Sequence, residues 1–393
     1  MPSLNNMFST LNKQPRRILL MYITKVSGHR QATVAIQKTL KNILPDAEIM
    51  SINGFEYTYP ILEKVVNKAY MGVIKRAPQI WDKMYDNPKL VKRSKLIKEF
   101  LNKKSHKKLH QLFETFNPDT VICTQAFPCG MVADYKTTHQ CSFNLIGVLT
   151  DFAPHAYWLN PGVDYYIVPS EDARKRFIQL GIAQDSIKVF GIPIRMKFAE
   201  KLNKQEAAEK LGLDPQVATV LIMGGGQGLG PIKKVVQSLI KLPKPIQLIV
   251  IAGVNIKLMD WLKKLQSKTD RKLLIYDYAN NVHELMDASA LIITKPGGMT
   301  TSESLTKGLP MIIVNPIPGQ EMHNTDFLMN KGIALRVDDV DDIAQQVSDL
   351  LASPQRLSSM SKAAYQHGKP YAAKDIAELV VSLPPKALAL VES

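Results

Sequence analysis

A short segment in the second half of the chain carries residue types that could bind phosphate. The apolar run 290–294 predicts a buried strand, and Lys-Pro-Gly-Gly at 295–298 predicts a turn that opens a helix. The unpaired N–H groups and the dipole of a helix N-terminus both favour a phosphate there. Glu303 falls roughly two turns into this helix, where its carboxylate could accept hydrogen bonds from a ribose.

A second segment follows the next apolar run, residues 311–314, and leads to the same predicted crevice. It contains Pro-Gly-Gln-Glu at 318–321, so Gln320, Glu321 and Asn324 could reach a ligand bound at the first turn. A phosphate cradle beside hydroxyl-binding side chains indicates a nucleotide-sugar site. The alternative interpretation is an ordinary strand–turn–helix in which glycine serves only the turn.

The glycine-rich run 224–230 supports the phosphate interpretation. It lies between a predicted strand, 221–223, and a predicted helix, 232–239, and glycine permits positive φ and close approach to a phosphate. A dinucleotide-binding loop would need an acid about 20 residues later at the end of a second strand, and none stands there. A nucleotide-triphosphate loop is excluded because Gly-Lys-Ser/Thr is absent.

The first half of the chain offers candidates for proton transfer. His29, in the predicted loop after the first strand, is a candidate general base near neutral pH, or it caps the following helix. Asp151, after a later strand, is a second candidate, and the sequence does not separate the two. His155 could orient a substrate, and Trp158 could touch a lipid or sugar or pack locally.

The elements that must position these residues alternate between strands and helices. This alternation predicts an α/β architecture with parallel sheets, arranged as two Rossmann-like domains that face a cleft. Ligands of such sheets bind at the carboxyl ends of the strands, so we expect the site in this cleft. The pattern breaks near residues 192–215, so we predict domains at 1–200 and 201–393, with the last helix, 373–381, packing back on the first. The predicted strands are 17–25, 48–53, 120–125, 144–150, 165–168, 219–223, 246–252, 273–276, 290–294, 311–314 and 334–337.

Charge and composition bear on the partner. Residues 1–200 hold 28 lysines and arginines against 16 acids, whereas residues 201–393 hold 22 against 19. The region 55–108 joins apolar and aromatic residues at helical spacing to a dense basic run, which is typical of a helix on an anionic membrane surface. A solvated helix face and core packing are the alternatives. No apolar run reaches the roughly 18 residues of a membrane span, and the three cysteines show no metal-ligand spacing.

Taken together, these motifs resemble the monogalactosyldiacylglycerol synthase and processive diacylglycerol glucosyltransferase family, inverting glycosyltransferases of the B-type fold. The resemblance extends from about residue 17 to residue 368. Its motifs are Ser-Gly-His-Arg at 27–30, Thr-Asp-Phe…His…Trp at 150–158, Asp-Tyr-Tyr-Ile-Val at 164–168, Gly-Ile-Pro at 191–193, the glycine-rich run, Lys-Pro-Gly-Gly with Glu303, and Pro-Gly-Gln-Glu.

The resemblance implies inverting transfer of a hexose from UDP-glucose or UDP-galactose to diacylglycerol, without a bound cofactor or catalytic metal. It implies a peripheral enzyme on the cytoplasmic face of the membrane, with no nucleic-acid partner. His29 and Asp151 would lie near the reaction centre, and His155 and Trp158 near the acceptor. The implied donor-binding residues are Gly224, Gly225, Gly226, Gln227, Gly228, Pro296, Gly297, Gly298, Met299, Thr300, Glu303, Gln320, Glu321 and Asn324.

One departure from the family pattern, and two general features of the chain, keep other activities open. Gln227 stands where many diacylglycerol enzymes carry an acid, which is similar to the peptidoglycan enzyme that transfers N-acetylglucosamine to a polyprenyl-linked precursor. A UDP-sugar epimerase shares the fold type and needs no lipid. A nucleic-acid binder, suggested by the basic first half, would leave the glycine-rich turns unexplained.

Overall fold

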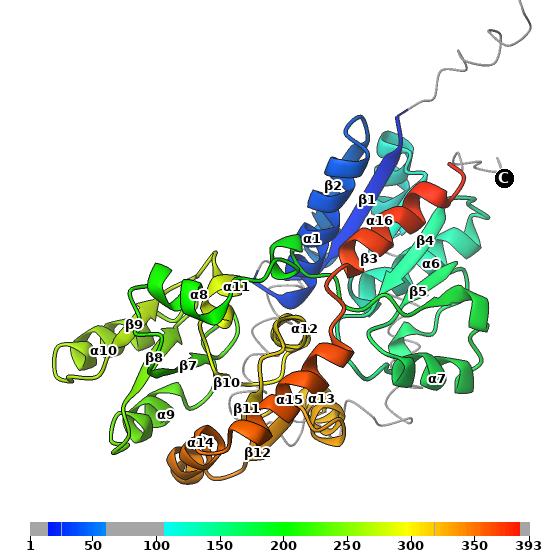
Figure 1. The fold of residues 1–393 in the computed structure, drawn as a ribbon. Helices are drawn as coiled ribbons and strands as arrows, with labels where there is room; N and C mark the ends of the chain where they lie inside the picture. Colours follow the sequence, from blue (N-terminus) through cyan, green and yellow to red (C-terminus); the bar gives the residue numbers. More distant parts are fainter. Residues whose placement is uncertain (1–14, 25, 60–105, 318, 386–393) are drawn as a thin grey trace, which may run out of the picture.

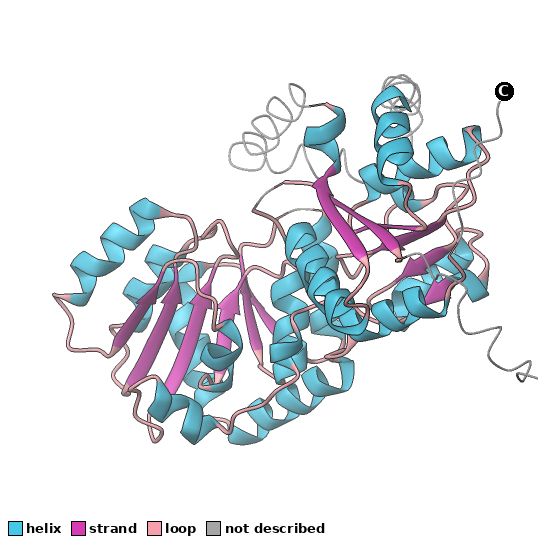
Figure 2. Cartoon of the chain, turned by 90° about the horizontal axis from the view of Figure 1, so that it is seen from above, coloured by secondary structure: helices cyan, strands magenta, loops and turns pink. Residues whose placement is uncertain are grey.

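The computed structural model describes residues 15–24, 26–59, 106–317 and 319–385, which form two six-stranded parallel sheets flanked by helices (Figures 1 and 2). The first sheet has the order β2-β1-β3-β4-β5-β6 and the second β12-β11-β10-β7-β8-β9. The predicted α/β fold with two Rossmann-like domains is confirmed. The first sheet contains β1 Arg17–Tyr22, β2 Glu48–Asn53, β3 Thr120–Cys123, β4 Asn144–Val148, β5 Tyr165–Ile167 and β6 Ile187–Lys188.

The second sheet also has six strands, and helices flank both sheets (Figure 2). Its strands are β7 Ala218–Met223, β8 Ile246–Ile251, β9 Leu273–Tyr276, β10 Leu291–Thr294, β11 Met311–Val314 and β12 Ala334–Val337. The helices are α1 Gly28–Ile43, α2 Gly54–Thr58, α6 Ala126–Thr138, α7 Glu171–Gln179, α8 Lys204–Lys210, α9 Ile232–Leu239, α10 Ile256–Gln266, α11 Val282–Asp287, α12 Gly298–Lys307, α13 Gln320–Asn330, α14 Ile343–Leu351, α15 Pro354–His367 and α16 Ala372–Ser382.

The continuous apolar strands follow from burial on both faces of each sheet. In β7, Leu221 packs into the core on one face of the sheet, while Val220 and Ile222 pack into the core on the other. Successive side chains of a strand point to opposite faces, so a strand covered by helices on both sides needs no polar alternation.

Each sheet has one point where the strand order reverses, and ligands of open α/β sheets bind beside such points. In the first sheet it lies between β1 and β3, and in the second between β7 and β10. At the second point Thr294 Oγ1 donates to the carbonyl oxygen of Met223 at 2.8 Å, which ties the two strand ends together. The glycine-rich run and Lys-Pro-Gly-Gly begin directly after these ends.

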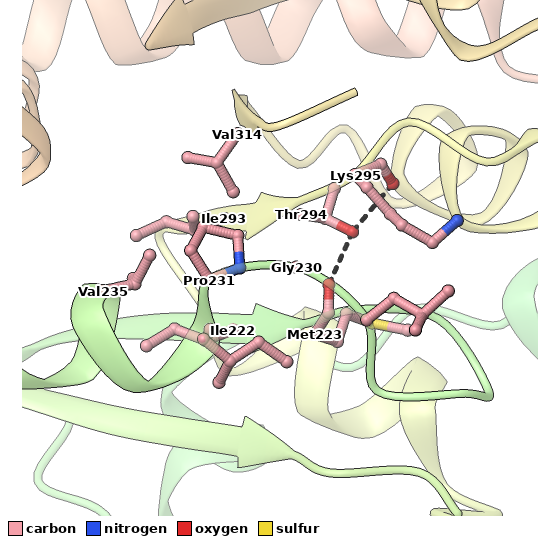
Figure 3. Close-up of a pocket in the computed structure, with 11 residues that line it drawn as sticks. Ile222, Met223, Gly230, Pro231, Val235, Ile293, Thr294, Lys295 and Val314 are labelled. Carbon is pink, nitrogen blue, oxygen red and sulfur yellow. Dashed lines mark hydrogen bonds between the residues drawn. The ribbon is translucent and has the colours of Figure 1, made fainter. Parts of the chain in front are cut away.

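A small apolar cavity lies behind this strand pair, between β7, β10 and the start of α9 (Figure 3). Ile222, Ile293, Val235 and Val314 contribute to its wall, and Pro231 closes it from the glycine-rich side. At about 10 Å³ it is too small for an organic ligand. The cavity is therefore a packing void beneath the loop.

Three predicted strands end at least two residues earlier in the structure than the sequence indicates. The strands predicted at 17–25, 120–125 and 144–150 end at Tyr22, Cys123 and Val148. Thr24 has a φ of 61°, in the left-handed region, which terminates the first of them. The apolar and β-branched residues beyond the strand ends belong to the loops that carry the site.

The last helix packs against the first sheet, although it follows the second sheet in the chain (Figure 1). Ile376 and Val380 of α16 share a buried cluster with Ile18 and Ile36. The segment that leads back to the first domain lies beside the segment that leaves it: a Cβ built on Gly191 would lie only 2.4 Å from Lys369 Cβ.

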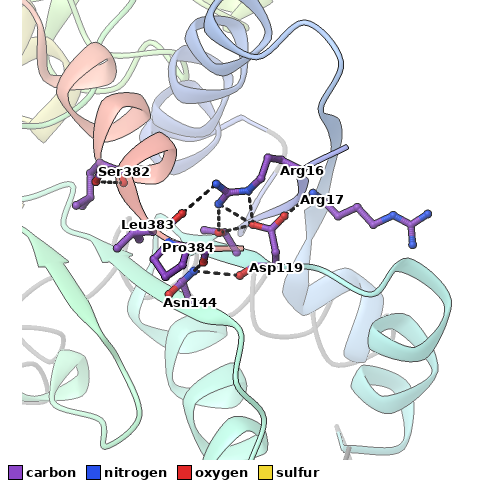
Figure 4. A network of polar contacts seen from close by, with 9 residues as sticks. Arg16, Arg17, Asp119, Asn144, Ser382, Leu383 and Pro384 are labelled. Atoms are coloured by element: carbon purple, nitrogen blue, oxygen red, sulfur yellow. Dashed lines mark hydrogen bonds and ion pairs between the residues drawn. The ribbon is translucent and has the colours of Figure 1, made fainter. Parts of the chain in front are cut away.

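A polar network fastens the end of α16 to the first sheet (Figure 4). Arg16 donates to Asp119 Oδ1 at 2.9 Å and to the carbonyl oxygen of Leu383 at 3.1 Å. Asn144 Nδ2 donates to the carbonyl oxygen of Pro384 at 3.1 Å. These contacts lie at the amino ends of β1, β3 and β4, whereas the loops of the site follow the carboxyl ends of the same strands.

The region predicted to bind a membrane falls mostly outside the described residues. Of residues 55–108, the structure describes 55–59, which comprise most of α2 and its C-cap, and 106–108, in a helical stretch that runs to residue 116. The prediction of a membrane-surface helix therefore lies outside the described part for residues 60–105. Within the described part, none of the helices has the length and apolar content needed to cross a membrane.

Candidate active site

The loops after β1, β3 and β4 meet at His29. His29 is the second residue of α1, and its Nδ1 lies 3.0 Å from the carbonyl oxygen of Thr124 and 2.8 Å from Thr150 Oγ1. Because a carbonyl oxygen can only accept, Nδ1 carries the hydrogen and Nε2 holds the lone pair. Burial lowers the pKa of His29 to about 4, against an opposing hydrogen bond to Thr124, so the ring is neutral at pH 7.

Asp151 follows β4 and is embedded in the loops of the second domain. Burial raises the pKa of Asp151 to about 6, while hydrogen bonds with Gln320 and Asn324 act in the opposite direction. The neighbouring Glu321 raises this pKa further and Lys295 lowers it. The carboxyl group therefore titrates close to neutral pH, which suits a group that must both accept and release a proton.

The adjoining loop is held by contacts between the two domains. Phe152 N donates to Asn324 Oδ1 at 2.9 Å, and the Phe152 ring stacks on Phe327 with centroids 4.7 Å apart. Asn324 is fully buried, and its Nδ2 donates to the carbonyl oxygen of Pro296 at 2.9 Å. Through these partners Asn324 positions the Asp151 loop.

The glycine-rich loop presents N–H groups in front of β7. Its carbonyl oxygens are engaged: those of Gly224 and Gly225 accept from Leu229 and Gly228 at 3.0 Å, and that of Gly226 accepts from Val254 at 3.0 Å. Among the described residues, no acceptor pairs with the N–H groups of residues 225–227. Consecutive unpaired N–H groups in a turn form an anion-binding concavity.

The Lys-Pro-Gly-Gly turn presents a second set of N–H groups at the start of α12. Gly297 is the N-cap, and within the described part of the chain no side chain caps this helix. A Cβ on Gly298 would lie 1.8 Å from the carbonyl oxygen of Thr150, so only glycine lets α12 approach the first domain this closely. The N-terminus of α12 therefore points to the region between Thr150 and the glycine-rich loop.

Lys295 and Glu321 form an ion pair between these turns. Their side chains are only 16% and 8% exposed. The second oxygen of the carboxylate, Glu321 Oε2, accepts from Ile317 N at 2.9 Å. The pair belongs to the wall that the second domain presents to Asp151.

Glu303 lies in the middle of α12, close enough to Arg195 for the two charges to interact. Burial raises the pKa of Glu303 to about 7, and Arg195 acts in the opposite direction. Arg195 also lines an interdomain groove of about 290 Å³. The remaining lining residues are Val26, Arg30, Gln31, Val34, Lys38, Val254, Tyr278 and Asn280. The glycine-rich loop adjoins this groove, since a Cβ on Gly226 would lie 3.4 Å from Val26 and 3.7 Å from Tyr278.

Trp158 and His155, the predicted acceptor-binding residues, are both at least partly buried in the first domain. Trp158 is 4% exposed and packs in the core of the first domain against Gly147. In this conformation its ring is covered, so core packing, the alternative in the sequence analysis, describes its position. His155 is partly buried, with its ring centroid 5.7 Å from that of Tyr157.

Several residues of the site were not assigned a role from the sequence. Lys295 was visible only as part of a turn, and Arg195 only as the residue after Gly-Ile-Pro-Ile. Thr124 contributes a carbonyl oxygen, which no side-chain pattern reveals. Within the described part of the chain, no cluster of three or more His, Cys, Asp or Glu side chains could hold a metal ion.

Comparisons with known proteins agree with this architecture. Residues 29–194 match the family model Monogalactosyldiacylglycerol (MGDG) synthase, and residues 219–378 match Glycosyltransferase family 28 C-terminal domain. The chain is 28% identical over 355 residues to the processive diacylglycerol beta-glucosyltransferase of Bacillus licheniformis, covering 88% of this chain and 90% of that relative. The enzyme of the same name from Staphylococcus epidermidis is 28% identical over 372 residues, covering 94% and 93%.

Solved structures show the same fold at lower identity. MurG of Acinetobacter baumannii matches with a TM-score of 0.65 and 16% identity, over 94% of this chain and 100% of that chain. The fold together with the family models and relatives defines a two-domain glycosyltransferase. The first half of the chain thus matches a monogalactosyldiacylglycerol synthase domain and the second half a glycosyltransferase family 28 C-terminal domain, which confirms the resemblance in the motifs.

Proposed function

We propose that the protein transfers a hexose from a UDP-sugar to the hydroxyl group of diacylglycerol, with inversion at the anomeric carbon. One observation carries the proposal: two sets of unpaired N–H groups, at 225–227 and at the start of α12, lie across the domain interface from Asp151. Such groups stabilise the negative charge that develops on a leaving diphosphate. A carboxyl group beside them supplies the base.

In this proposal the UDP-sugar has one orientation, with the uridine in the groove and the hexose next to Asp151. The uridine would occupy the groove that adjoins Gly226, with Tyr278 and the valines against the base and Glu303 accepting from the ribose hydroxyls. The diphosphate would lie on the two sets of N–H groups. The hexose would then reach Gln320 and Glu321, next to Asp151.

Asp151, in preference to His29, is proposed as the general base. A base works best when its pKa lies near the working pH, and that of Asp151 is about 6 whereas that of His29 is about 4. His29 stays neutral, with its Nε2 lone pair available to orient the acceptor hydroxyl. The Thr124 carbonyl oxygen fixes the tautomer that makes this possible.

The reaction follows as a single displacement. The acceptor oxygen bonds to the anomeric carbon from the face opposite the diphosphate, while the bond from that carbon to the diphosphate oxygen breaks. The hydroxyl proton passes to Asp151, and the electron pair of the broken bond leaves with UDP. The close interdomain contact at Gly298 excludes water from this region, which would limit hydrolysis of the donor.

Glucose is the hexose that the names of the relatives favour. Because diacylglycerol is a membrane lipid, the proposed reaction would take place at a membrane surface. We propose peripheral binding to the cytoplasmic face, supported by the charge of the first half, with 28 basic against 16 acidic residues. The segment 55–108 is the proposed anchor. Flotation with anionic and neutral vesicles tests it, and equal recovery with both would count against electrostatic binding.

The test of the reaction measures UDP release from UDP-glucose, UDP-galactose and UDP-N-acetylglucosamine, with vesicles that contain or lack diacylglycerol. We expect release that depends on diacylglycerol and on one of the two UDP-hexoses. Release without lipid would indicate hydrolysis or epimerisation instead. Release only from UDP-N-acetylglucosamine with a polyprenyl-linked acceptor would reassign the chain to that reaction.

A further inference from the structure

Lys295 occupies a position that its role in the turn does not explain. It follows β10, and its Nζ lies 4.0 Å from the Cβ position of Gly225 and 3.7 Å from that of Gly297. The ammonium group therefore sits between the two sets of unpaired N–H groups. Both turns direct positive charge or partial positive charge to one spot, which is an arrangement for a doubly charged anion.

The ion pair with Glu321 fixes this ammonium group in place. Glu321 is held in turn by Ile317 N, so the carboxylate has one defined position. Burying two charges costs more free energy than an exposed pair, and an apolar pair of the same size is often at least as stable. Stability alone thus gives no reason for this pair. An ammonium group has three donors, and Glu321 is its one hydrogen-bonding partner in the described part of the chain.

We propose that Lys295 binds the diphosphate of the donor and stabilises its charge as UDP leaves, with Glu321 as the residue that positions it. This assignment rests on the proposed function and adds a side-chain cation to the backbone N–H groups. As the diphosphate takes up the ammonium group, Glu321 becomes available to the hexose hydroxyls. Donor binding and sugar recognition are then coupled through one ion pair.

The same pair links the leaving group to the base. Lys295 lowers the pKa of Asp151, and Glu321 raises it. When the diphosphate neutralises Lys295, the Asp151 carboxylate loses a stabilising cation, so its pKa rises in the donor complex. The acid limb of kcat should therefore lie at higher pH than that of kcat/KM, because the former reports the complex and the latter the free enzyme.

The experiment compares the binding of UDP and of uridine by calorimetry in the full-length protein and in Lys295→Gln. Loss of a charge-assisted contact should weaken UDP binding about 10- to 100-fold and leave uridine binding unchanged. Lys295→Arg should restore most of the UDP affinity. Lys263→Gln removes an exposed lysine of α10 as the charge-matched control and should alter neither ligand.

A double variant guards against a folding defect. Lys295→Gln alone leaves Glu321 as an unpaired buried carboxylate, whereas Lys295→Gln with Glu321→Gln leaves neither charge. The double variant should fold, bind uridine normally and bind UDP weakly. Unchanged UDP affinity, or equal weakening of UDP and uridine in the double variant, would overturn the role of Lys295. Failure of the unmodified protein to bind UDP would overturn the proposed function as well.

Discussion

The two halves of the site bind and act by different physical means. The second domain offers mainly backbone N–H groups, held by glycines, and uses few side chains at the proposed diphosphate position. The first domain offers side chains, His29 and Asp151, whose pKa values burial has shifted in opposite directions. In the proposed reaction, fixed dipoles on one side would stabilise the charge of the leaving group, and a carboxyl group with a shifted pKa on the other would take up the proton.

The contrast has a physical basis. Fixed dipoles need no reorganisation when charge develops on a leaving group. They therefore suit a diphosphate, which is already anionic in the donor and gains further negative charge as it leaves. A proton acceptor must change its charge, so it needs an environment that balances the two states. Burial, two amides, one carboxylate and one ammonium group provide that balance at Asp151.

The largest effect is expected at Asp151. Asp151→Asn removes the base, and we expect kcat to fall about 10²- to 10⁴-fold with little change in UDP affinity. Asp185→Asn, on the exposed surface, is the matched control. In the unmodified enzyme, kcat/KM should decline as the pH falls through about 6, because only the ionised carboxylate accepts the proton. A profile that declines only near pH 4 would favour His29.

A smaller but still large effect is expected at the interdomain contact. In Gly298→Ala the new methyl group meets the Thr150 carbonyl oxygen at 1.8 Å, so α12 must move away from the first domain. A shift of about 1 Å in a reacting group can cost roughly 10² in rate. Initial rates at saturating donor measure the loss. Activity near that of the unmodified enzyme would show that the domains need not approach this closely.

Donor affinity should fall moderately in Glu303→Ala. Hydrogen bonds from ribose hydroxyls to a carboxylate are worth about 1.5–3 kcal/mol, so binding should weaken about 10- to 100-fold, with the fold intact. Glu209→Ala on the exposed face of α8 provides the comparison. Titration with UDP gives the affinity, and a value equal to that of the control would remove Glu303 from the ribose role.

The smallest catalytic effect is expected at Trp158. Trp158→Phe removes part of a buried ring and should lower the free energy of unfolding by about 1–3 kcal/mol, while KM for the lipid acceptor stays the same. Thermal unfolding and acceptor titration measure the two quantities. A raised KM without loss of stability would return Trp158 to the acceptor site.

The fold was predictable from the sequence because continuous apolar runs and glycine turns are local signals. The strands 48–53, 273–276, 311–314 and 334–337 were predicted to the residue, and the motifs identified the family. Contacts between distant residues were not predictable. The Thr124 carbonyl oxygen fixes the His29 tautomer, and Asn324 holds the Asp151 loop, and both depend on loops brought together only in the folded chain.

The return of α16 to the first sheet has a consequence for the order in which the protein is made. The second domain is continuous in the chain, so all of its strands and α8 to α15 leave the ribosome before α16 does. The first domain begins earlier but lacks Ile376 and Val380, which share a buried cluster with Ile18 and Ile36, until α16 has been made. Domains usually fold in the order of synthesis, whereas here the domain that starts first is expected to be finished last.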